Sequence, residues 1–386
     1  MLQRFYLRNY KVFKDDTEIS LVADESGHCP EQILNNGLLK TCMIFGANNE
    51  GKTKMIEGLS LLQNYALKGE LPSTDMLLSG RGKINGTELI ELSMDFLLKV
   101  RGPETLFRYS ILIRQETDVR NVDFIGGSPN YRIKTYHVDA EILKTVEDNG
   151  FDTVLYYKRP DDNCHLRQFV ENYNDHSNKP GYNLNELEHK QICAAFDWIK
   201  NNLVICRVND HYFLKSDEIS NDMYNLAEIV RCMDVGIQDL KGSLDDGPDS
   251  ITVVHRGGWE SDIHKESEGT RRIIELGSML IPGSEGKTFV VDELNRKLHP
   301  ELTRRFIELF VRDEREQKQL IFTTHESRLL TEDLFRRDQI WFVRKTSPNI
   351  SSLVSLTSID PKRKNSMWDD YVKTMNKQLD RKERDR

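Results

Sequence analysis

The segment Gly46–Thr53 has the residue types and spacing of a phosphate-binding loop. It reads Gly-Ala-Asn-Asn-Glu-Gly-Lys-Thr and fits GxxxxGK[ST] at every fixed position. The glycines let backbone N–H groups approach phosphate oxygens, Lys52 reaches the β- and γ-phosphates, and Thr53 offers its hydroxyl to Mg²⁺. We therefore predict a nucleotide site formed by Gly46, Asn48, Asn49, Glu50, Gly51, Lys52, Thr53 and Lys54.

Glu50 places a carboxylate inside this loop, where bound phosphate would also carry negative charge. Either this carboxylate lowers the affinity for nucleotide, or it points out to solvent. The sequence leaves both alternatives open.

Two acidic residues follow the short apolar segment Thr288–Val291. Ligands bind at the carboxyl ends of parallel strands, so Asp292 is placed to hold Mg²⁺ through water and Glu293 to polarise the attacking water. By itself an Asp-Glu pair after a strand is often a surface turn. The phosphate loop upstream favours the functional interpretation, because the pair supplies the metal and water roles that the loop lacks.

His325 follows the apolar segment Gln319–Thr323, one predicted strand after the acidic pair. A histidine there can orient or sense the γ-phosphate, although a lone histidine after a strand is commonly a polar turn residue. Ser267 precedes a helical pattern that contains Gly269. Ser267 is either a helix N-cap or, with the exposed N–H groups, a binding site for a phosphate from a second molecule.

The elements around these residues predict a mixed α/β fold. The order strand, glycine loop, helix is expected over Leu39–Phe45 and Lys52–Tyr65. Alternating short strands near the N-terminus, at Gln3–Asn9 and Leu89–Leu98 among others, indicate an antiparallel sheet. Strands and helices alternate in the last third, which predicts a parallel α/β core, with strands at 288–291, 319–323 and 339–344 and helices at 300–312 and 327–335.

Composition limits the class of protein. The net charge of −8 excludes a uniformly basic nucleic-acid binder but not a local basic patch. None of the six cysteines forms a CxxC pair, which is typical of thiols in a reducing compartment. No apolar run reaches the ~18 residues of a membrane span, and the N-terminus lacks the apolar core of a signal peptide. We expect a cytoplasmic protein with no membrane contact.

In order, the motifs resemble the ABC-type ATPase heads of SMC, Rad50 and RecF proteins. The opening Phe5–Phe13, the phosphate loop (Walker A) and Asp292-Glu293 (Walker B) resemble that family. Ser267–Thr270 resembles its signature motif, Asn295–Pro300 its D-loop with Leu-His-Pro, and His325 its switch histidine. Over residues 266–344 the chain closely resembles the stand-alone AAA/ABC ATPases of bacterial defence operons, of the RloA and abortive-infection type.

The resemblance implies a head with a mixed N-terminal β-sheet, a parallel α/β core and a helical insertion. The expected divisions are an N-terminal ATPase lobe (1–139), a helical insertion (140–250), a C-terminal ATPase lobe (251–360) and a basic tail (361–386). The tail carries nine Lys/Arg against five Asp/Glu. It is either a solvated end or a contact with DNA, RNA or a partner.

The resemblance also implies a mechanism. Two copies would close on two ATP molecules with Mg²⁺, each ATP held by Lys52 and Thr53 of one copy and covered by Ser267 and Gly269 of the other. Glu293 would activate water beside His325. In the defence relatives, such a machine regulates a separate effector encoded in the same operon, often a nuclease.

The sequence departs from the family in three places. Asn295 stands at a D-loop position that is usually Asp, Gln115 is only a candidate for the Q-loop glutamine, and the longer aromatic and glycine-rich ending is missing.

Two other functions are alternatives to this one. A RecF- or Rad50-like repair ATPase that clamps duplex DNA is the main alternative, and it would require a basic surface across the dimer. An intrinsic nuclease of the kind fused to a TOPRIM domain is disfavoured, because only about 60 residues follow His325, fewer than a typical domain.

Overall fold

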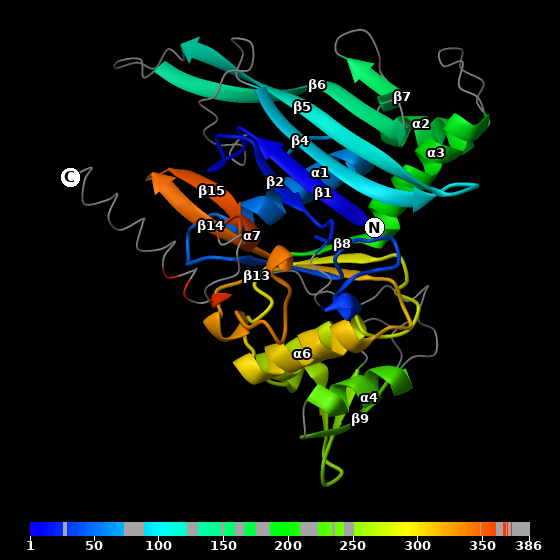
Figure 1. The fold of residues 1–386 in the computed structure, drawn as a ribbon, viewed down its shortest axis with the longest axis vertical. Coiled ribbons are helices and arrows are strands. Elements are labelled where there is room, and N and C mark those ends of the chain that lie inside the picture. The colour runs from blue at the N-terminus through cyan, green and yellow to red at the C-terminus, as the bar shows by residue number, and fades with distance from the viewer. Residues whose placement is uncertain are drawn as a thin grey trace. The chain divides into compact units, whose positions relative to one another are not determined.

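The computed structural model describes most of the 386 residues. The described residues are 1–25, 29–72, 89–121, 130–147, 150–158, 166–174, 186–208, 223–233, 236–242, 251–347, 349–359, 366, 367, 369 and 372. They form two compact units that interleave along the chain (Figure 1). Unit 1 comprises 1–21, 53–203 and 344–353, and unit 2 comprises 22–52, 204–343 and 354–386.

Unit 1 contains an antiparallel sheet of six strands in the order β2-β1-β4-β5-β6-β7. Short β1 and β2 come from the N-terminus, and the later strands are longer. Their bounds are β1 Leu2–Arg8, β2 Thr17–Ser20, β4 Leu89–Lys99, β5 Glu104–Asn121, β6 Asn130–Glu147 and β7 Gly150–Lys158. Alternation of buried and partly exposed residues along β1 produces one face that packs inward.

Helix α1 (Lys52–Lys68) lies close to β1 within unit 1. A Cβ added at Gly58 would stand 3.3 Å from the ring of Tyr10 and 3.4 Å from the side chains of Leu7 and Phe5. The absence of a side chain at Gly58 therefore permits the close approach of helix and strand. Helices α2 (Leu166–Asn174) and α3 (Glu186–Asp197) also belong to this unit, and α3 continues into a π-helical turn at Trp198–Asn202.

Unit 2 is built on a sheet whose central strands are parallel, in the order β15-β14-β3-β13-β12-β8. The pairs β12–β13, β13–β3 and β14–β3 are all parallel. The division of the sequence into units falls within β8, β14 and β15. The bounds are β3 Thr41–Phe45, β8 Leu203–Cys206, β12 Thr288–Val291, β13 Gln319–Thr324, β14 Ile340–Ser347 and β15 Ile350–Ser355.

Parallel pairing brings the carboxyl ends of β3, β13 and β12 to one edge of the sheet. In the register, Phe45 lies beside Thr324, and Val291 lies beside Phe322. The phosphate loop follows β3, the acidic pair follows β12, and His325 follows β13. The three segments therefore emerge on neighbouring strands at the same edge.

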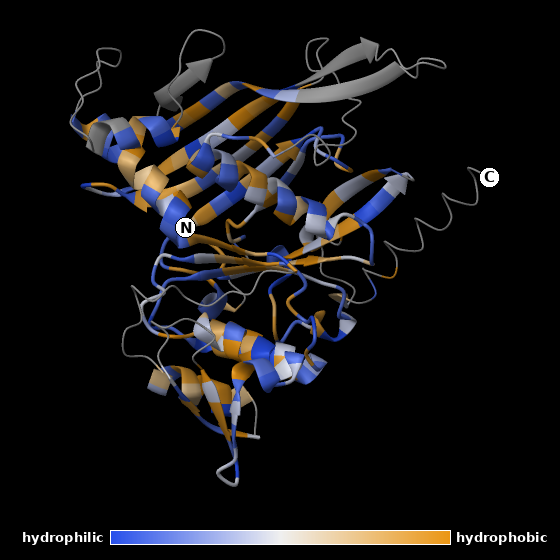
Figure 2. Ribbon diagram, turned by 180° about the vertical axis from the view of Figure 1, so that it is seen from behind, coloured by the Kyte–Doolittle hydropathy of each residue, from blue (hydrophilic) through white to orange (hydrophobic). Residues whose placement is uncertain are grey.

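Helices and a small sheet complete unit 2. In Figures 1 and 2, α4 and α6 lie together on one side of the parallel strands, which carry mostly hydrophobic residues. Helix α6 faces the core with Phe306, Ile307 and Phe310, and these residues pack in one cluster with Phe289 and Phe322. The bounds are α4 Met223–Met233, α5 Glu268–Ser278, α6 Pro300–Arg312, α7 Leu356–Ile359, β9 Ile237–Lys241, β10 Thr252–His255 and β11 Glu260–Asp262.

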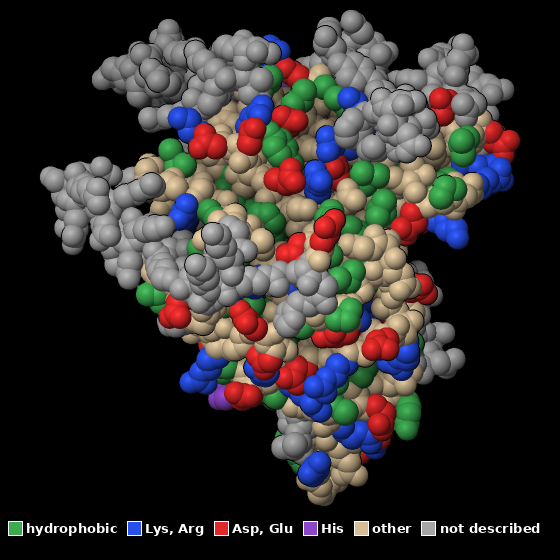
Figure 3. Space-filling model, in the orientation of Figure 1, with side chains coloured by type: hydrophobic (Ala, Val, Ile, Leu, Met, Phe, Trp, Pro, Cys, Tyr) green, Lys and Arg blue, Asp and Glu red, His purple; other side chains and the backbone are tan. Residues whose placement is uncertain are grey.

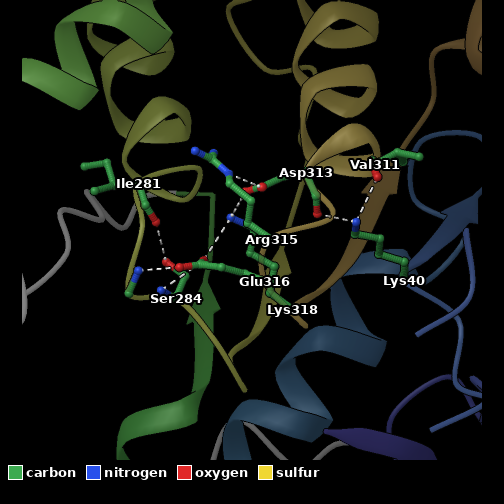
Figure 4. Close-up of polar contacts among 9 residues, drawn as sticks. Lys40, Ile281, Ser284, Val311, Asp313, Arg315, Glu316 and Lys318 are labelled. Atoms are coloured by element: carbon green, nitrogen blue, oxygen red, sulfur yellow. Dashed lines mark hydrogen bonds and ion pairs between the residues drawn. The ribbon is translucent and has the colours of Figure 1, made fainter. Parts of the chain in front are cut away.

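A buried charge network lies at the amino ends of β3 and β13, opposite the ends that the phosphate loop and His325 follow (Figure 4). The fully buried Lys318 places Nζ 2.9 Å from Asp313 Oδ2 and 3.4 Å from Glu316 Oε2. Glu316 also accepts the backbone N–H of Ser284 at 3.1 Å. Lys40 donates to the carbonyls of Val311 and Asp313, at 2.8 and 2.6 Å. These bonds fix the loop that joins α6 to β13, because a buried charge is tolerated only when it is paired.

The mixed α/β fold, with an antiparallel N-terminal sheet and a parallel core, confirms the sequence-based expectation. The interval 140–250 does contain α2, α3 and α4, but it also contains the end of β6 and strands β7, β8 and β9. The prediction of a helix over 327–335 was wrong, since only a 3₁₀ turn at Ser327–Leu329 forms there. Most of the tail lies outside the described residues. The Gln115 side chain also lies outside what is described.

Among the described residues, no helix combines the length and apolar character required to cross a membrane.

Candidate nucleotide site

The phosphate loop connects the fully buried strand β3 to helix α1. A Cβ at Gly46 would lie 2.7 Å from the carbonyl oxygen of Val343, so β14 leaves no room for a side chain there. Asn49 and Gly51 have φ values of 63° and 117°, in the left-handed region, which curls the loop. Asn48 and Asn49 are exposed. A loop backbone of this kind can bind an anion such as phosphate.

Lys52 is buried at the base of the loop. Its Nζ donates to the carbonyls of Gly46 at 2.7 Å and Ala47 at 2.9 Å. Burial lowers the pKa of Lys52 below its usual value, and the carboxylates of Glu50, Glu293 and Asp292 oppose that shift. The predicted phosphate cation and both predicted acidic residues therefore share one electrostatic environment.

Glu50 folds into the loop rather than out to solvent. It is only 7% exposed, and its Oε2 accepts the N–H of Ala47 at 2.9 Å. This resolves the direction of the side chain, which the sequence left open. The carboxylate therefore already occupies one backbone donor of the loop.

The two residues after Lys52 differ in their surroundings. Thr53 is half-buried in the first turn of α1, a position from which a hydroxyl can act as a metal ligand. Lys54 Nζ lies 2.8 Å from Glu57 Oε1 on the same helix. The ammonium of Lys54, predicted as part of the nucleotide site, is thus paired within the helix.

The acidic pair is tied to the end of β13 by Thr323. Asp292 is 1% exposed, and its Oδ1 accepts the hydroxyl of Thr323 at 2.6 Å. The backbone N–H of Glu293 donates to the same hydroxyl oxygen at 2.7 Å. Glu293 has φ 51°, a conformation that costs a non-glycine residue of order 1–3 kcal/mol and persists only where its surroundings hold it. The chain thus turns sharply after β12.

Thr324 and His325 follow directly. The Thr324 hydroxyl donates to Asn295 Oδ1 at 2.9 Å and accepts the N–H of Glu326 at 3.0 Å. His325 is exposed just beyond β13. Asn295, which departs from the Asp expected in the D-loop, therefore lies against the strand that leads to the predicted switch histidine.

Ser267 caps α5 with its side chain exposed. Its Oγ accepts the N–H of Thr270 at 3.0 Å, so the structural role proposed for this serine is present. A Cβ at Gly269 would lie 3.1 Å from the carbonyl oxygen of Lys297, and Lys297 forms an ion pair with Glu268. The predicted signature motif and the D-loop segment are therefore in direct contact.

Sequence reasoning missed Thr323 and Thr324 as parts of the site. Thr323 ends the apolar segment predicted as a strand, and Thr324 follows it. The available signal was two hydroxyl residues at the carboxyl end of a parallel strand that neighbours the acidic pair, where polar side chains meet ligands.

The donor set fits a nucleotide bound with Mg²⁺. Magnesium commonly takes one or two carboxylates together with substrate phosphates, and Asp292 is a buried carboxylate held in one orientation. The glycine loop and Lys52 would hold the phosphates of such a nucleotide.

Comparison with known proteins places the chain in a family. Residues 42–331 match the family described as "AAA domain, putative AbiEii toxin, Type IV TA system". No match was found among curated proteins.

Solved structures similar to the chain include SMC heads. One is the SMC head domain from Thermotoga maritima, with 13% identity, 92% of this chain and 98% of that chain covered, and a TM-score of 0.45. Another is an SMC head bound to the C-winged helix domain of ScpA, with 15% identity, coverages of 92% and 97%, and a TM-score of 0.47. A third, derived from Pyrococcus furiosus, is an SMC head with an extended coiled coil bound to the C-terminal domain of ScpA, with 13% identity, 92% and 97% covered, and a TM-score of 0.46.

Proposed function

The chain belongs to the AAA-domain family that its residues 42–331 match, and from this premise we propose that it binds and hydrolyses ATP. The observation that carries the proposal is the meeting of the phosphate loop with the acidic pair. The loop follows β3 and the pair follows β12, and the parallel register through β13 brings both to the same edge of the sheet. Burial lowers the pKa of Lys52, and the charges of Glu293 and Asp292 are among those that oppose this shift.

Each residue has a distinct task in this proposal. The N–H groups of Gly46–Thr53 and the Lys52 ammonium hold the β- and γ-phosphates, and the Thr53 hydroxyl and the Asp292 carboxylate hold Mg²⁺. When bound, Mg²⁺ neutralises charge that develops on the phosphates. Glu293 orients and polarises the attacking water, and His325 contacts the γ-phosphate side of the site.

The active state that we propose is a pair of chains closed on two ATP molecules. Ser267 and Gly269 of one copy would cover the γ-phosphate held by the other copy. The exposed Ser267 side chain and the adjoining N–H groups of α5 support this, because a helix N-terminus favours an anion. The contact between Gly269 and Lys297 would couple closure to the D-loop segment.

We further propose that this ATPase senses infection and regulates a separate, nuclease-like effector encoded beside it in an anti-phage operon. The family description, which reads "putative AbiEii toxin, Type IV TA system", supports this proposal. So does the resemblance of residues 266–344 to defence ATPases. On the face seen in Figure 3, acidic and basic side chains mix over the described part of α4 and α6, so this face offers no single-sign surface for DNA.

Two assays test these proposals. Phosphate release by the purified chain with ATP and Mg²⁺ tests hydrolysis, with the Lys52→Ala variant as the control. Co-purification with neighbouring gene products, expressed from the native operon, tests the effector. A chain that turns over no ATP would overturn the ATPase assignment. A chain that binds no neighbour but retains duplex DNA in the presence of ATP would support the repair clamp instead.

A further inference from the structure

Thr323 lies at the centre of the contacts that shape the acidic pair. It is fully buried on β13, between β3 on one side and β12 on the other. Its neighbour in sequence, Phe322, lies beside Val291, the last residue of β12. The side chain of Thr323 is thus placed one step beyond the end of β12, where Asp292 and Glu293 begin the next turn.

Three consecutive residues bond to this one threonine. Its hydroxyl donates to Asp292 Oδ1 at 2.6 Å, it accepts the N–H of Glu293 at 2.7 Å, and its carbonyl accepts the N–H of Leu294 at 3.0 Å. The direction of each bond is fixed by chemistry. A backbone N–H can only donate, so the single hydroxyl proton of Thr323 is directed to the carboxylate.

These contacts determine the two features that the reaction needs. The first is the rotation of the Asp292 carboxylate, since one oxygen is engaged by the hydroxyl. The second is the left-handed backbone at Glu293, with φ 51°, which directs that side chain away from the course of an extended strand. A strained conformation persists only where neighbouring groups hold it.

We propose that Thr323 is a positioning residue that sets both the metal-holding carboxylate of Asp292 and the water-polarising carboxylate of Glu293. This inference rests on the proposed ATPase function. Thr323 touches neither phosphate nor water in the proposal and acts through the two acidic residues. It links the strand that leads to His325 with the strand that carries the acidic pair.

Thr288 provides a matched comparison on the same two strands. It is also fully buried, at the other end of β12, and its hydroxyl donates to Gln319 Oε1 on β13 at 3.0 Å. Removing the Thr288 hydroxyl therefore breaks a buried bond between β12 and β13 without touching the acidic pair. Comparing Thr288→Val with Thr323→Val therefore separates the general effect of losing a buried hydroxyl bond from a specific effect on the acidic pair.

The experiment compares the wild type with Thr323→Val, Thr323→Ser and Thr288→Val. For each variant, the melting temperature, ATP affinity without Mg²⁺, kcat and the Mg²⁺ concentration for half-maximal hydrolysis are measured. We expect Thr323→Val to lower kcat and to raise the required Mg²⁺ by about 10-fold or more, which is the usual effect of removing a group that orients a metal ligand. ATP affinity without Mg²⁺ should stay unchanged, because Lys52 and the loop are intact.

Thr323→Ser keeps the hydroxyl and should hydrolyse ATP with nearly wild-type kcat and Mg²⁺ dependence. Thr288→Val should melt earlier than wild type yet show normal kinetics. The proposal is overturned if Thr323→Val keeps wild-type kcat and Mg²⁺ dependence. It is also overturned if Thr323→Ser is as defective as Thr323→Val, or if Thr288→Val changes the Mg²⁺ dependence as much as Thr323→Val does. A folded wild type that neither binds nor hydrolyses ATP would instead remove the proposed function itself, and the role of Thr323 with it.

Discussion

Glu50 provides the sharpest prediction for nucleotide affinity, because its carboxylate already occupies the phosphate loop. Its Oε2 accepts the N–H of Ala47 at 2.9 Å, and the side chain is 7% exposed beside the Lys52 ammonium. A nucleotide must displace this carboxylate or tolerate its charge. Glu50→Gln keeps the shape of the side chain and removes the charge.

The size of the effect follows from the type of bond. A hydrogen bond to a charged group contributes about 1.5–3 kcal/mol and a neutral one about 0.5–1.5 kcal/mol, so the substitution weakens the internal bond by roughly 1–1.5 kcal/mol. Since about 1.4 kcal/mol is tenfold in affinity, Glu50→Gln should bind ATP roughly tenfold more tightly. Reduced repulsion of the phosphates acts in the same direction.

Titration calorimetry with ATP, and separately with ADP, measures the dissociation constants. Glu308→Gln is the control, because it removes one negative charge from unit 2 on helix α6, where Glu308 pairs with Arg304. Its affinity for ATP should equal that of the wild type. Unchanged or weaker binding by Glu50→Gln would refute the view that this carboxylate competes with phosphate.

Three further predictions concern the loop, the buried charges and the dimer. Lys52→Ala should abolish ATP binding in calorimetry through loss of the phosphate cation, and wild-type affinity would reject the site. Lys318→Met should cost about 3–5 kcal/mol in urea unfolding because it leaves the buried Glu316 without its Lys318 partner and Asp313 with only the exposed Arg315. Arg315→Ala, which removes the 73% exposed partner of the same Asp313, should cost about 1 kcal/mol or less; equal losses would contradict the network. Although burial opposes it, hydrogen bonds from Arg315 and Lys318 lower the pKa of Asp313. Ionised Asp313 therefore contributes to the free energy of unfolding above the ordinary Asp pKa, and this contribution is lost as pH falls through the lowered pKa. The difference in unfolding free energy between wild type and Lys318→Met should therefore become smaller in acid. Ser267→Arg should leave ATP affinity intact but prevent ATP-dependent self-association, measured by sedimentation; normal association would exclude Ser267 from the interface.

Elements whose signal is local were predictable from sequence. The pattern in Gly46–Thr53 predicted a loop between a buried strand and a helix, and β3 and α1 are those elements. Helix α6 has the predicted bounds Pro300–Arg312, because His299 accepts the N–H of Glu301, proline opens the first turn and an apolar stripe follows. Strand β12 was also predicted with its full bounds.

The failures occurred where tertiary contacts override local pattern. Leu330 and Leu334 have helical spacing, but they anchor an irregular loop in the core after a single 3₁₀ turn that Glu326 caps. The role of Thr323 depends on β12 and β13 being neighbours, and the inward direction of Glu50 depends on the curl of its own loop. Spacing along the chain carries neither kind of information. The proposed domain boundaries at 139 and 250 and the roles of the site residues remain predictions.

The central claim is that two copies of this chain close on ATP before hydrolysis. Light scattering of Glu293→Gln, with and without ATP and Mg²⁺, tests it most directly, because this variant should bind ATP but hydrolyse it very slowly. We expect the mass of one chain without nucleotide and of two chains with ATP and Mg²⁺, and no such increase for a variant that also carries Lys52→Ala. A variant that binds ATP in calorimetry yet keeps one mass in both conditions would contradict the claim.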